Sequence, residues 1–331
     1  MTIYDIAQMA GVSASTVSRV INGKPGVGEK KRKEILALLE KNNYTPDINA
    51  RNLVKQSTHT IGILIDDIDS RNQSDGLSRA ENEIMKNGFF CFTKYIGKGP
   101  DVLENGIRSL AENKVDGALL MGVSFMDHAV LRRLIERYLK DIPIVLVHQT
   151  ERIDLDNVYC IGASEKEGFE RCVRRLAERG RKNIALFIDK NRFSRDLIQG
   201  YFETALKRYP DIRGWVYRDI EETFAEGART MRRVLKEHPE VDAVLSARDG
   251  IAIGAMYECM DQGRAVPRDI SVIGESNSLV CEACRPRLSS LDTMLSMSSP
   301  MAARMLVDVL SGGESAKKVV MEMELVERET I

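Results

Sequence analysis

The sequence lacks long apolar runs, and this absence excludes two classes of protein. No apolar run follows Met1, so we expect no signal peptide. No stretch approaches about 18 uninterrupted apolar residues, so we expect no membrane span and no membrane partner. These absences predict a cytoplasmic protein.

The sequence also lacks a cysteine framework. Its six cysteines are scattered along 331 residues, which fits a reducing compartment better than a set of disulfides. Cys281 and Cys284 form a single CxxC, without a second pair or a nearby histidine. Two incidental thiols near a loop explain this pair, and a metal or redox role is the alternative.

Catalytic patterns are missing as well. The four histidines lie far apart in the sequence, and no GxSxG, HExxH or GxxxxGK[ST] motif occurs. We therefore expect no enzyme, no cofactor and no metal.

The chain as a whole has almost no net charge, but its charged residues are unevenly distributed along the sequence. Residues 1–58 hold nine Lys/Arg and five Asp/Glu, a net charge of +4, and because the total is −1 the remainder carries −5. A basic end on a mildly acidic body is typical of a tethered nucleic-acid-binding module. A merely solvated helix face is the alternative.

The first 45 residues predict three short helices. Ile3, Ile6, Ala7 and Ala10 recur at helical spacing after a capping Thr2, and Gly11 ends the helix. Ser13 caps a second helix, whose buried face is Val17, Val20 and Ile21 and which ends at Asn22-Gly23. A third helix runs from Glu29 to Asn42. This succession is the plan of a helix-turn-helix unit, although three-helix units also occur as plain packing modules.

The second helix carries the candidate DNA contacts. Ala14 and Ser15 would face base edges, Arg19 would reach a guanine edge or a phosphate, and other polar side chains would reach phosphates. The proposed DNA-binding residues of this unit are Thr2, Ser13, Ala14, Ser15, Thr16, Ser18, Arg19 and Asn22.

A polar segment at residues 46–58 follows, and it reads as a linker. Asn49, Ala50 and Leu53 would form a short helix only with outside support, because an isolated helix of this length is marginal in water.

At this point the sequence resembles the lactose-repressor (LacI) family of bacterial transcription regulators. The resemblance rests on TIYDIA at residues 2–7, GVSASTVSRVING at 11–23, NYTP at 43–46 and ARNL at 50–53, and it continues through the rest of the chain. It implies that Ala14, Ser15 and Arg19 read bases. It also implies that residues 50–53 are a hinge helix that folds on the operator, with Leu53 as a minor-groove wedge. Asn49 and Ala50 join the DNA-binding set on this basis.

Residues 59–331 alternate between apolar strands and amphipathic helices. We expect strands at residues 59–65, 89–95, 115–121, 142–148, 183–188, 241–246 and 270–274, with helices between them. This pattern predicts an α/β body of two doubly wound parallel sheets. The first lobe spans about 59–160 and 290–317, and the second about 161–289 and 318–331. In this arrangement 288–292 returns to the first lobe, and one strand at 318–327 joins the second. The LacI family shares this plan with periplasmic sugar-binding proteins.

Ligands bind such folds at the carboxyl ends of strands, between the lobes. The proposed effector-binding residues are Asp67, Asn72, Gln73, Arg195, Asp249 and Ser276. Helix capping and surface polarity are the alternative explanation for such side chains. Compared with the family, Asn72 and Gln73 replace an aromatic pair, Arg195 substitutes for an arginine at 197, and Ser276 replaces an aspartate. A simple hexose is therefore disfavoured, and a polyhydroxylated, amino-bearing or anionic molecule is expected.

These observations predict a homodimeric regulator that binds a palindromic operator and responds to a small effector. Two headpieces are needed because one offers too little surface for a tight specific site. The first alternative is the same regulator signalled by a partner protein, with a vestigial cleft. The second is a solute-binding protein, which the basic headpiece opposes.

Overall fold

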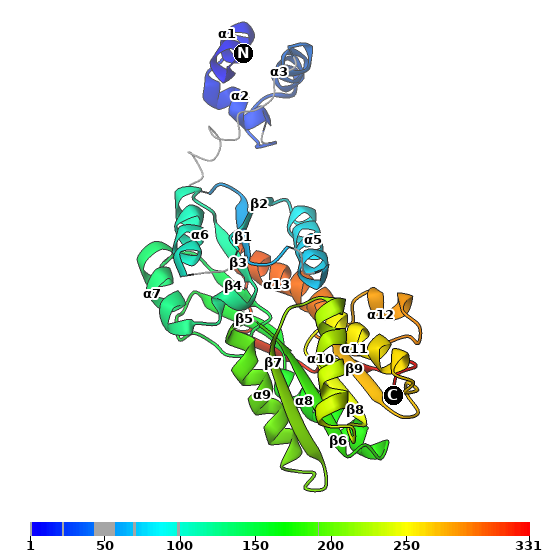
Figure 1. The fold of residues 1–331 in the computed structure, drawn as a ribbon. Helices are drawn as coiled ribbons and strands as arrows, with labels where there is room; N and C mark the ends of the chain where they lie inside the picture. Colours follow the sequence, from blue (N-terminus) through cyan, green and yellow to red (C-terminus); the bar gives the residue numbers. More distant parts are fainter. Residues whose placement is uncertain (1, 22, 43–56, 69–70, 98–99, 191) are drawn as a thin grey trace. The chain divides into compact units, whose positions relative to one another are not determined.

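The computed structural model describes residues 2–21, 23–42, 57–68, 71–97, 100–190 and 192–331, without the side chains of residues 71, 72, 100 and 192–194. It divides into two compact units, residues 1–58 and 59–331, which we call the headpiece and the body. Figure 1 colours both units along the sequence.

The headpiece is a three-helix unit with its own small core. Its helices are α1 (Ile3–Ala10), α2 (Ala14–Ile21) and α3 (Glu29–Lys41). The core comprises Ile6, Ala7, Ala10, Val17, Val20 and Ile35. Ile35 is the only described residue of α3 that is fully enclosed. Because a unit this small is marginally stable, the loss of about 2–5 kcal/mol on truncating Ile35 to alanine is expected to unfold it.

Helix α1 is capped at both ends as its sequence predicts. Asp5 N donates to Thr2 Oγ1 at 3.3 Å, and Thr2 N donates to Asp5 Oδ2 at 2.7 Å, which forms a capping box. These hydrogen bonds lower the pKa of Asp5. Gly11 ends the helix with a φ of 62°, a conformation that favours glycine.

The first lobe of the body is built on a six-stranded parallel sheet. The strand order is β11-β5-β4-β3-β1-β2. The strands are β1 (Thr60–Ile65), β2 (Phe90–Tyr95), β3 (Gly117–Met121), β4 (Ile144–Val147), β5 (Val158–Ala163) and β11 (Lys318–Met321). Its helices are α5 (Arg71–Lys86), α6 (Pro100–Glu112), α7 (His128–Tyr138) and α13 (Leu295–Leu310), with a 3-10 turn η1 (Val123–Phe125).

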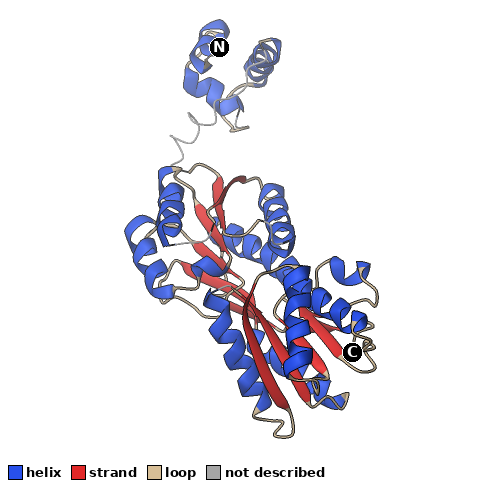
Figure 2. Cartoon of the chain, viewed as in Figure 1, coloured by secondary structure: helices blue, strands red, loops and turns tan. Residues whose placement is uncertain are grey.

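The side chains of β1 show how this sheet is covered on both faces. Ile61, Ile63 and Ile65 pack into the core under α5 and α13, while Leu64 packs into the core under α6 and α7. This alternation is the period-two pattern of a strand buried on both sides. Figure 2 shows the helices on the two faces of the sheet.

The second lobe repeats the plan with one reversed strand. The order is β12-β10-β9-β8-β6-β7, all parallel except that β12 runs antiparallel to β10. The strands are β6 (Asn183–Asp189), β7 (Arg213–Ile220), β8 (Ala243–Ser246), β9 (Ser271–Glu275), β10 (Ser289–Asp292) and β12 (Glu324–Val326). Helices α8 (Glu165–Glu178) and α9 (Arg192–Leu206) cover one face, α10 (Phe224–Glu237) and α11 (Asp249–Asp261) cover the other, and α12 (Val280–Ala283) is a short turn. The prediction of two doubly wound parallel sheets is confirmed.

Helices α10 and α11 approach closely because glycines face each other's backbone. A Cβ on Gly227 would collide with the carbonyl oxygen of Ile251, and a Cβ on Gly254 would collide with that of Phe224. Helix α9, by contrast, has open space around Gly200.

The strands of the two lobes differ from the sequence prediction in three places. The prediction for residues 288–292 is wrong, because β10 pairs with β9 in the second sheet rather than returning to the first. The single strand expected at 318–327 is also wrong, because the chain changes sheets within it. Its first half, β11, extends the first sheet beside β5, and its second half, β12, pairs with β10. Strand β5 was not predicted, although all six of its residues are buried.

Two further findings bear on what the chain can hold. No described helix is long and apolar enough to cross a membrane. The six cysteines are free, and burial raises the pKa of both Cys281 and Cys284.

Candidate DNA-binding surface and inter-lobe ligand site

Helix α2 has one face in the core and one face in solvent. Val17 and Val20 are buried, whereas Ser15 and Arg19 are exposed. Ser15 and Arg19 are four residues apart and therefore lie on the same side of the helix. Ala14 is half-buried and packs against the headpiece core, so only part of its surface faces outward.

Hydroxyl groups gather at the N-terminus of α2. Ser13 Oγ lies 2.8 Å from Ser15 Oγ and 2.9 Å from Thr16 Oγ1, and it accepts a hydrogen bond from Thr16 N at 3.3 Å. Ser18, in the next turn, is half-buried. The positive end of a helix with hydroxyl donors is a favourable environment for a phosphate.

The loop after α2 makes room for Arg19. Gly26 has a φ of +100°, and a Cβ there would lie 2.9 Å from Arg19 Nη1. Two basic residues brace the unit rather than remaining free: Lys31 Nζ donates to Ala10 O at 2.7 Å, and Arg32 Nη2 donates to Lys24 O at 2.5 Å. The positive charge of the headpiece is therefore partly structural, which the sequence did not reveal.

Four of the expected DNA-binding residues, Asn22, Asn49, Ala50 and Leu53, lie outside the described residues. Their proposed roles remain predictions.

In the body, buried polar atoms without partners collect where strands end. Asp66 follows β1, His148 and Gln149 follow β4, Glu275 ends β9 and Thr293 follows β10. Among the described residues, none forms a hydrogen bond with Asp66 Oδ1, His148 Nδ1, Gln149 Nε2, Glu275 Oε2, Thr293 Oγ1 or Gln73 Oε1. An unpaired buried polar atom costs about 1–3 kcal/mol, so a set of them at strand ends of both sheets indicates a place for a ligand.

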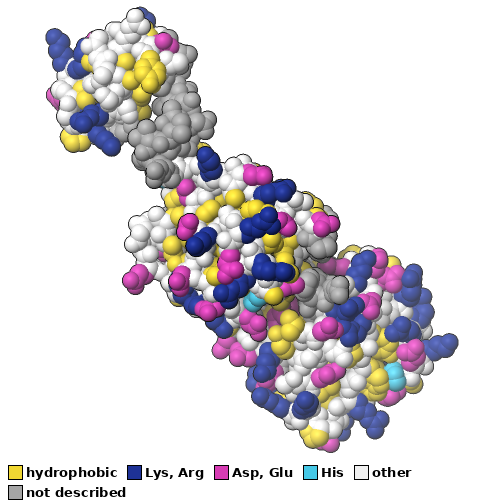
Figure 3. Space-filling model, turned by 90° about the vertical axis from the view of Figure 1, so that its left-hand side faces the viewer, with side chains coloured by type: hydrophobic (Ala, Val, Ile, Leu, Met, Phe, Trp, Pro, Cys, Tyr) yellow, Lys and Arg dark blue, Asp and Glu magenta, His cyan; other side chains and the backbone are white. Residues whose placement is uncertain are grey.

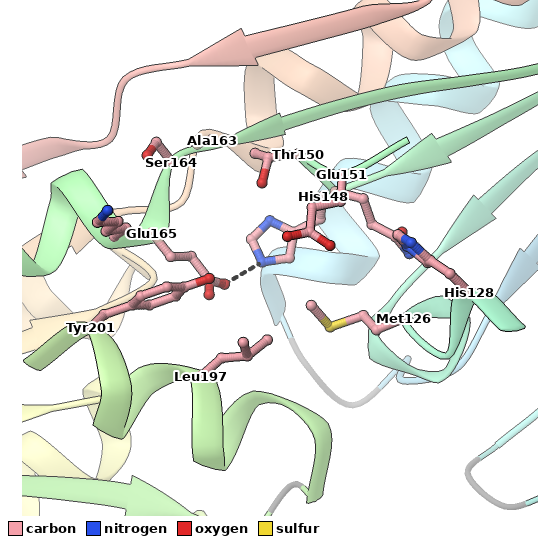
Figure 4. Close-up of a pocket in the computed structure, with 12 residues that line it drawn as sticks. Met126, His128, His148, Thr150, Glu151, Ala163, Ser164, Glu165, Leu197 and Tyr201 are labelled. Atoms are coloured by element: carbon pink, nitrogen blue, oxygen red, sulfur yellow. Dashed lines mark hydrogen bonds and ion pairs between the residues drawn. The ribbon is translucent and has the colours of Figure 1, made fainter. Parts of the chain in front are cut away.

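A cavity of about 180 Å³ lies between the lobes beside two of these residues. The first lobe lines it with Met126, His128, His148, Gln149, Thr150, Glu151 and Ala163, the last residue of β5, and the second lobe lines it with Glu165, Lys166, Leu197 and Tyr201; Ser164 lies between β5 and α8. Figure 4 shows His148 and Glu165 approaching from opposite walls, with Tyr201 and Leu197 on α9. His148 Nε2 lies 3.4 Å from Glu165 Oε1, and His128 Nε2 lies 2.8 Å from Gln149 Oε1.

Two carboxylates surround the half-buried Arg248, close to Glu165 of the cavity wall. Arg248 Nε lies 2.8 Å from Asp189 Oδ2 and 3.3 Å from Glu222 Oε2. Burial alone would lower the pKa of Arg248, but the neighbouring carboxylates, led by Asp189 and Glu222, raise it above its usual range. Burial raises the pKa of Glu222, and the charges of Asp189 and Asp67 add to this.

The expected effector residues are spread over different surroundings. Gln73 has an unpaired buried Oε1, Asn72 lies in the first turn of α5 with its side chain outside the description, and Arg195 pairs with Asp219 of β7. Ser276, with a φ of 112°, lines a second cavity of about 380 Å³ between α5 and the loop after β9. Of the five whose side chains are described, Ser276 alone is a lining residue of either cavity.

The side chain of Asp249 forms its hydrogen bonds inside the second lobe. Its Oδ1 accepts from Ser290 Oγ at 2.6 Å, and its Oδ2 accepts from Ser278 N at 2.8 Å and Ser278 Oγ at 2.7 Å. The side chain is buried, and this burial raises its pKa. Asp249 thus ties the start of α11 to β10 and to the loop after β9, which argues against its expected role in holding an effector.

Sequence reasoning missed four residues of the site, namely His148, Gln149, Glu165 and Glu275. Three of them end or directly follow a buried strand, and Glu165 begins the helix after β5. Their position was the available signal, because strand ends in these sheets converge on the ligand site. Glu165 had no such signal while β5 was unrecognised.

A helix-turn-helix headpiece joined to a two-lobed body of the periplasmic-binding type defines a DNA-binding transcriptional regulator. Residues 2–47 match the bacterial regulatory proteins of the lacI family, and residues 173–331 match a periplasmic binding protein-like domain. The whole chain is 30% identical to the probable HTH-type transcriptional repressor ExuR of Bacillus subtilis, 98% of which is covered. It is 29% identical, over 99% of the relative, to an HTH-type transcriptional regulator of Lachnoclostridium phytofermentans.

The fold has a close counterpart among solved structures. The lac repressor dimer bound to operator and the anti-inducer ONPF matches 100% of this chain and 98% of its own, with a TM-score of 0.89 and 22% identity. The chain belongs to the lacI family of bacterial regulatory proteins. It is a transcriptional regulator and not an enzyme, as its sequence predicts.

Proposed function

We propose that the protein is a repressor that binds a palindromic operator as a homodimer and is controlled by a small polar effector between its lobes. The observation that carries the DNA-binding part is the exposed face of α2, where Ser15 and Arg19 lie opposite the buried Val17 and Val20. A helix of this kind enters the major groove, and an arginine on it contacts a guanine edge or a phosphate.

Dimer formation is supported by apolar side chains left in solvent on the body. Leu279 is 62% exposed and Tyr257 is 41% exposed. They belong to one neighbourhood, because Arg285 N, just after α12, donates to Tyr257 OH at 3.4 Å. Replacing Leu279 with arginine is expected to shift sedimentation equilibrium toward monomer. Val320→Arg, on the exposed edge strand β11, is the matched control and should leave the mass unchanged.

Effector control is supported by the unpaired atoms at the strand ends. A vestigial cleft with a partner protein as signal would leave Gln149 Nε2 and His148 Nδ1 buried without compensation, whereas a ligand in the cavity would pair with them. We propose that ligand binding changes the angle between the lobes and thereby the spacing of the two hinge segments at the operator. Leu53, as the wedge of this hinge, is part of the proposal.

The test is a selection of random duplexes with the full-length protein at low ionic strength, followed by gel shifts on the selected site. A palindromic sequence should emerge, and affinity should fall steeply with salt because phosphate contacts dominate. Arg19→Ala should cost more than about 1 kcal/mol of binding, roughly one base contact. Selection of no palindrome, with and without candidate metabolites, would refute the proposal.

The hinge is tested separately by operator bending. Leu53→Ala should reduce bending and affinity together in a circular-permutation gel, because the wedge opens a base step. If the variant complex has the same gel mobility as the parent complex, Leu53 is not the wedge, and the proposed major-groove contacts are unaffected.

A further inference from the structure

The partly buried carboxylate of the inter-lobe cavity lining is Glu165, whereas Glu151 and Lys166 of the same lining are exposed. On the face of the body shown in Figure 3, basic and acidic side chains are intermixed. At the cavity, Glu165 forms part of the wall, and Glu275, Asp189 and Glu222 lie near it around Arg248.

The cations described near this wall are already occupied or exposed. Arg248 donates through Nε to Asp189 and Glu222 and through Nη1 to Ala247 O at 3.0 Å. Arg195 pairs with Asp219. Lys166 lines the cavity but is exposed, so water screens its charge. An anionic ligand would thus find no free buried cation among the described side chains.

Carboxylate oxygens, in contrast, are left without partners. Glu275 is 3% exposed and Asp66 is fully buried, and within the described part of the chain Glu275 Oε2 and Asp66 Oδ1 have no hydrogen-bond donor. Burial raises the pKa of Glu275 well above its usual range, and the charge of Glu165 raises it further. Glu165, which lines the cavity, is therefore close enough to Glu275 for its charge to act on that carboxyl group.

A second, independent feature points to a ligand in the same place. Gln149 is 4% exposed and lines the cavity, and its Nε2 has no partner among the described residues. Such an amide would pair with a ligand hydroxyl or carbonyl. A metal ion does not fit, because no group of three or more described His, Cys, Asp or Glu side chains is arranged to hold one.

We propose that the effector is a small polar molecule with a protonated amino group, which lies against Glu165 while hydrogen-bonding groups of the ligand pair with Gln149 and His148. The inference rests on the proposed effector site and specifies the chemical class that it takes. It also replaces the anionic ligand that the arginines of the sequence suggested. A buried ammonium–carboxylate pair of this kind is a charge-assisted interaction and discriminates strongly against a neutral analogue.

The experiment is a comparison of matched ligands on the full-length protein by thermal shift and calorimetry. The probes are glucosamine and galactosamine, each with its N-acetyl derivative, and putrescine with its N,N′-diacetyl derivative, together with glucose and glucuronate. At least one amine should bind, with an affinity at least tenfold above that of its acetylated derivative. Binding confined to neutral or anionic probes, or no binding by any amine, would overturn the proposal.

Variants locate the charge that is recognised. Glu165→Gln should lower the affinity for the amine at least tenfold, whereas Glu167→Gln, exposed in the same first turn of α8, should leave it unchanged. Glu222→Gln, at a half-exposed position beside Arg248, is a second variant should the first not fold. Equal affinities in Glu165→Gln, Glu222→Gln and the parent would contradict the assignment.

Gel shifts on the same preparations separate this proposal from the proposed function. If an amine binds but the protein has no affinity for an operator, the proposed ligand class is supported and the proposed repressor function is refuted. If the protein binds an operator but no amine, the repressor function is supported and the proposed ligand class is refuted.

Discussion

His148 Nε2, at the end of β4, lies 3.4 Å from Glu165 Oε1, at the start of α8, and this contact joins the two lobes at the cavity wall. The backbone of His148 is in the left-handed region, with a φ of 64°. A non-glycine residue in that conformation is held there by its surroundings, and such residues cluster at functional sites. The distance between His148 and Glu165 is therefore expected to depend on the angle between the two lobes, and so on whether a ligand lies between them.

Replacing His148 with asparagine tests this link. Asparagine tolerates a positive φ, but it is too short to reach Glu165, so the lobes should separate more often. Hydrogen–deuterium exchange of residues 161–168 is expected to accelerate. His128→Asn is the control, because His128 lines the same cavity but contacts Gln149 within its own lobe. Equal acceleration in both variants would show that the contact does not hold the lobes.

Gly26 should prove essential for the position of Arg19. Alanine at a φ of +100° is strained by about 1–2 kcal/mol, and its Cβ would lie 2.9 Å from Arg19 Nη1. Gly26→Ala should therefore lower both the melting temperature of the headpiece and the affinity for the operator. Gly28→Ala is the matched control, since Gly28 has a φ of −59° and no atom within 4 Å of the added Cβ. Because Gly28 is the N-cap of α3, where glycine is preferred to alanine, that change is expected to cost up to about 1 kcal/mol of stability and to leave the operator affinity unchanged.

Glu275 predicts a pH dependence of stability. Its pKa in the folded protein lies well above the ordinary 4.5, so the folded state holds more protons than the unfolded state above that pH. The contribution of Glu275 to stability therefore falls as the pH rises from about 4.5 through its folded pKa. Glu275→Gln removes this loss, and it should raise the melting temperature more at pH 8 than at pH 5.

Asp269 supplies a control of the opposite sign. A hydrogen bond from Arg268, and then one from Ala265 N, lowers its pKa to about 2, so its stabilising effect is complete above 3.8 and is lost only toward pH 2. Asp269→Asn should lower the melting temperature equally at pH 5 and pH 8. A parallel response of the two variants would contradict the raised pKa of Glu275.

The crossing of α10 and α11 predicts a large effect from a single methyl group. Gly254→Ala would bring a Cβ into the carbonyl oxygen of Phe224, and overpacking of this kind costs about 1–3 kcal/mol. Gly200→Ala, in the interior of α9 with open space around it, should instead stabilise by about 0.5–1 kcal/mol. Urea unfolding of both variants measures the difference, and a loss of stability in Gly200→Ala would refute the distinction.

Local patterns were sufficient for most elements of the fold. The spacing of Val17 and Val20 oriented α2, and apolar runs such as residues 60–65 located strands buried on both faces. Local patterns did not predict which strands pair with one another. Residues 318–326 form a strand in either lobe, and only the three-dimensional neighbours, β5 and β10, decide where the chain changes sheets.

The candidate site was predicted by position but not in its contacts. Strand ends pointed to the edge of each sheet at which the cavity lies, yet Asp249 forms its hydrogen bonds inside the second lobe and His148 lines the cavity. A sequence shows which residues are polar, but it does not show which of them already have internal partners. Ser278 and Ser290, which bind Asp249, are far from it in the chain.

Because the chain changes lobes after β5, after β10 and again between β11 and β12, neither sheet is complete until residues 318–326 have been made. When residues 1–300 have left the ribosome, the headpiece is complete, but the sheets of both lobes still lack a strand. During synthesis, the headpiece thus precedes the body, and the two sheets of the body are completed within a few residues of each other.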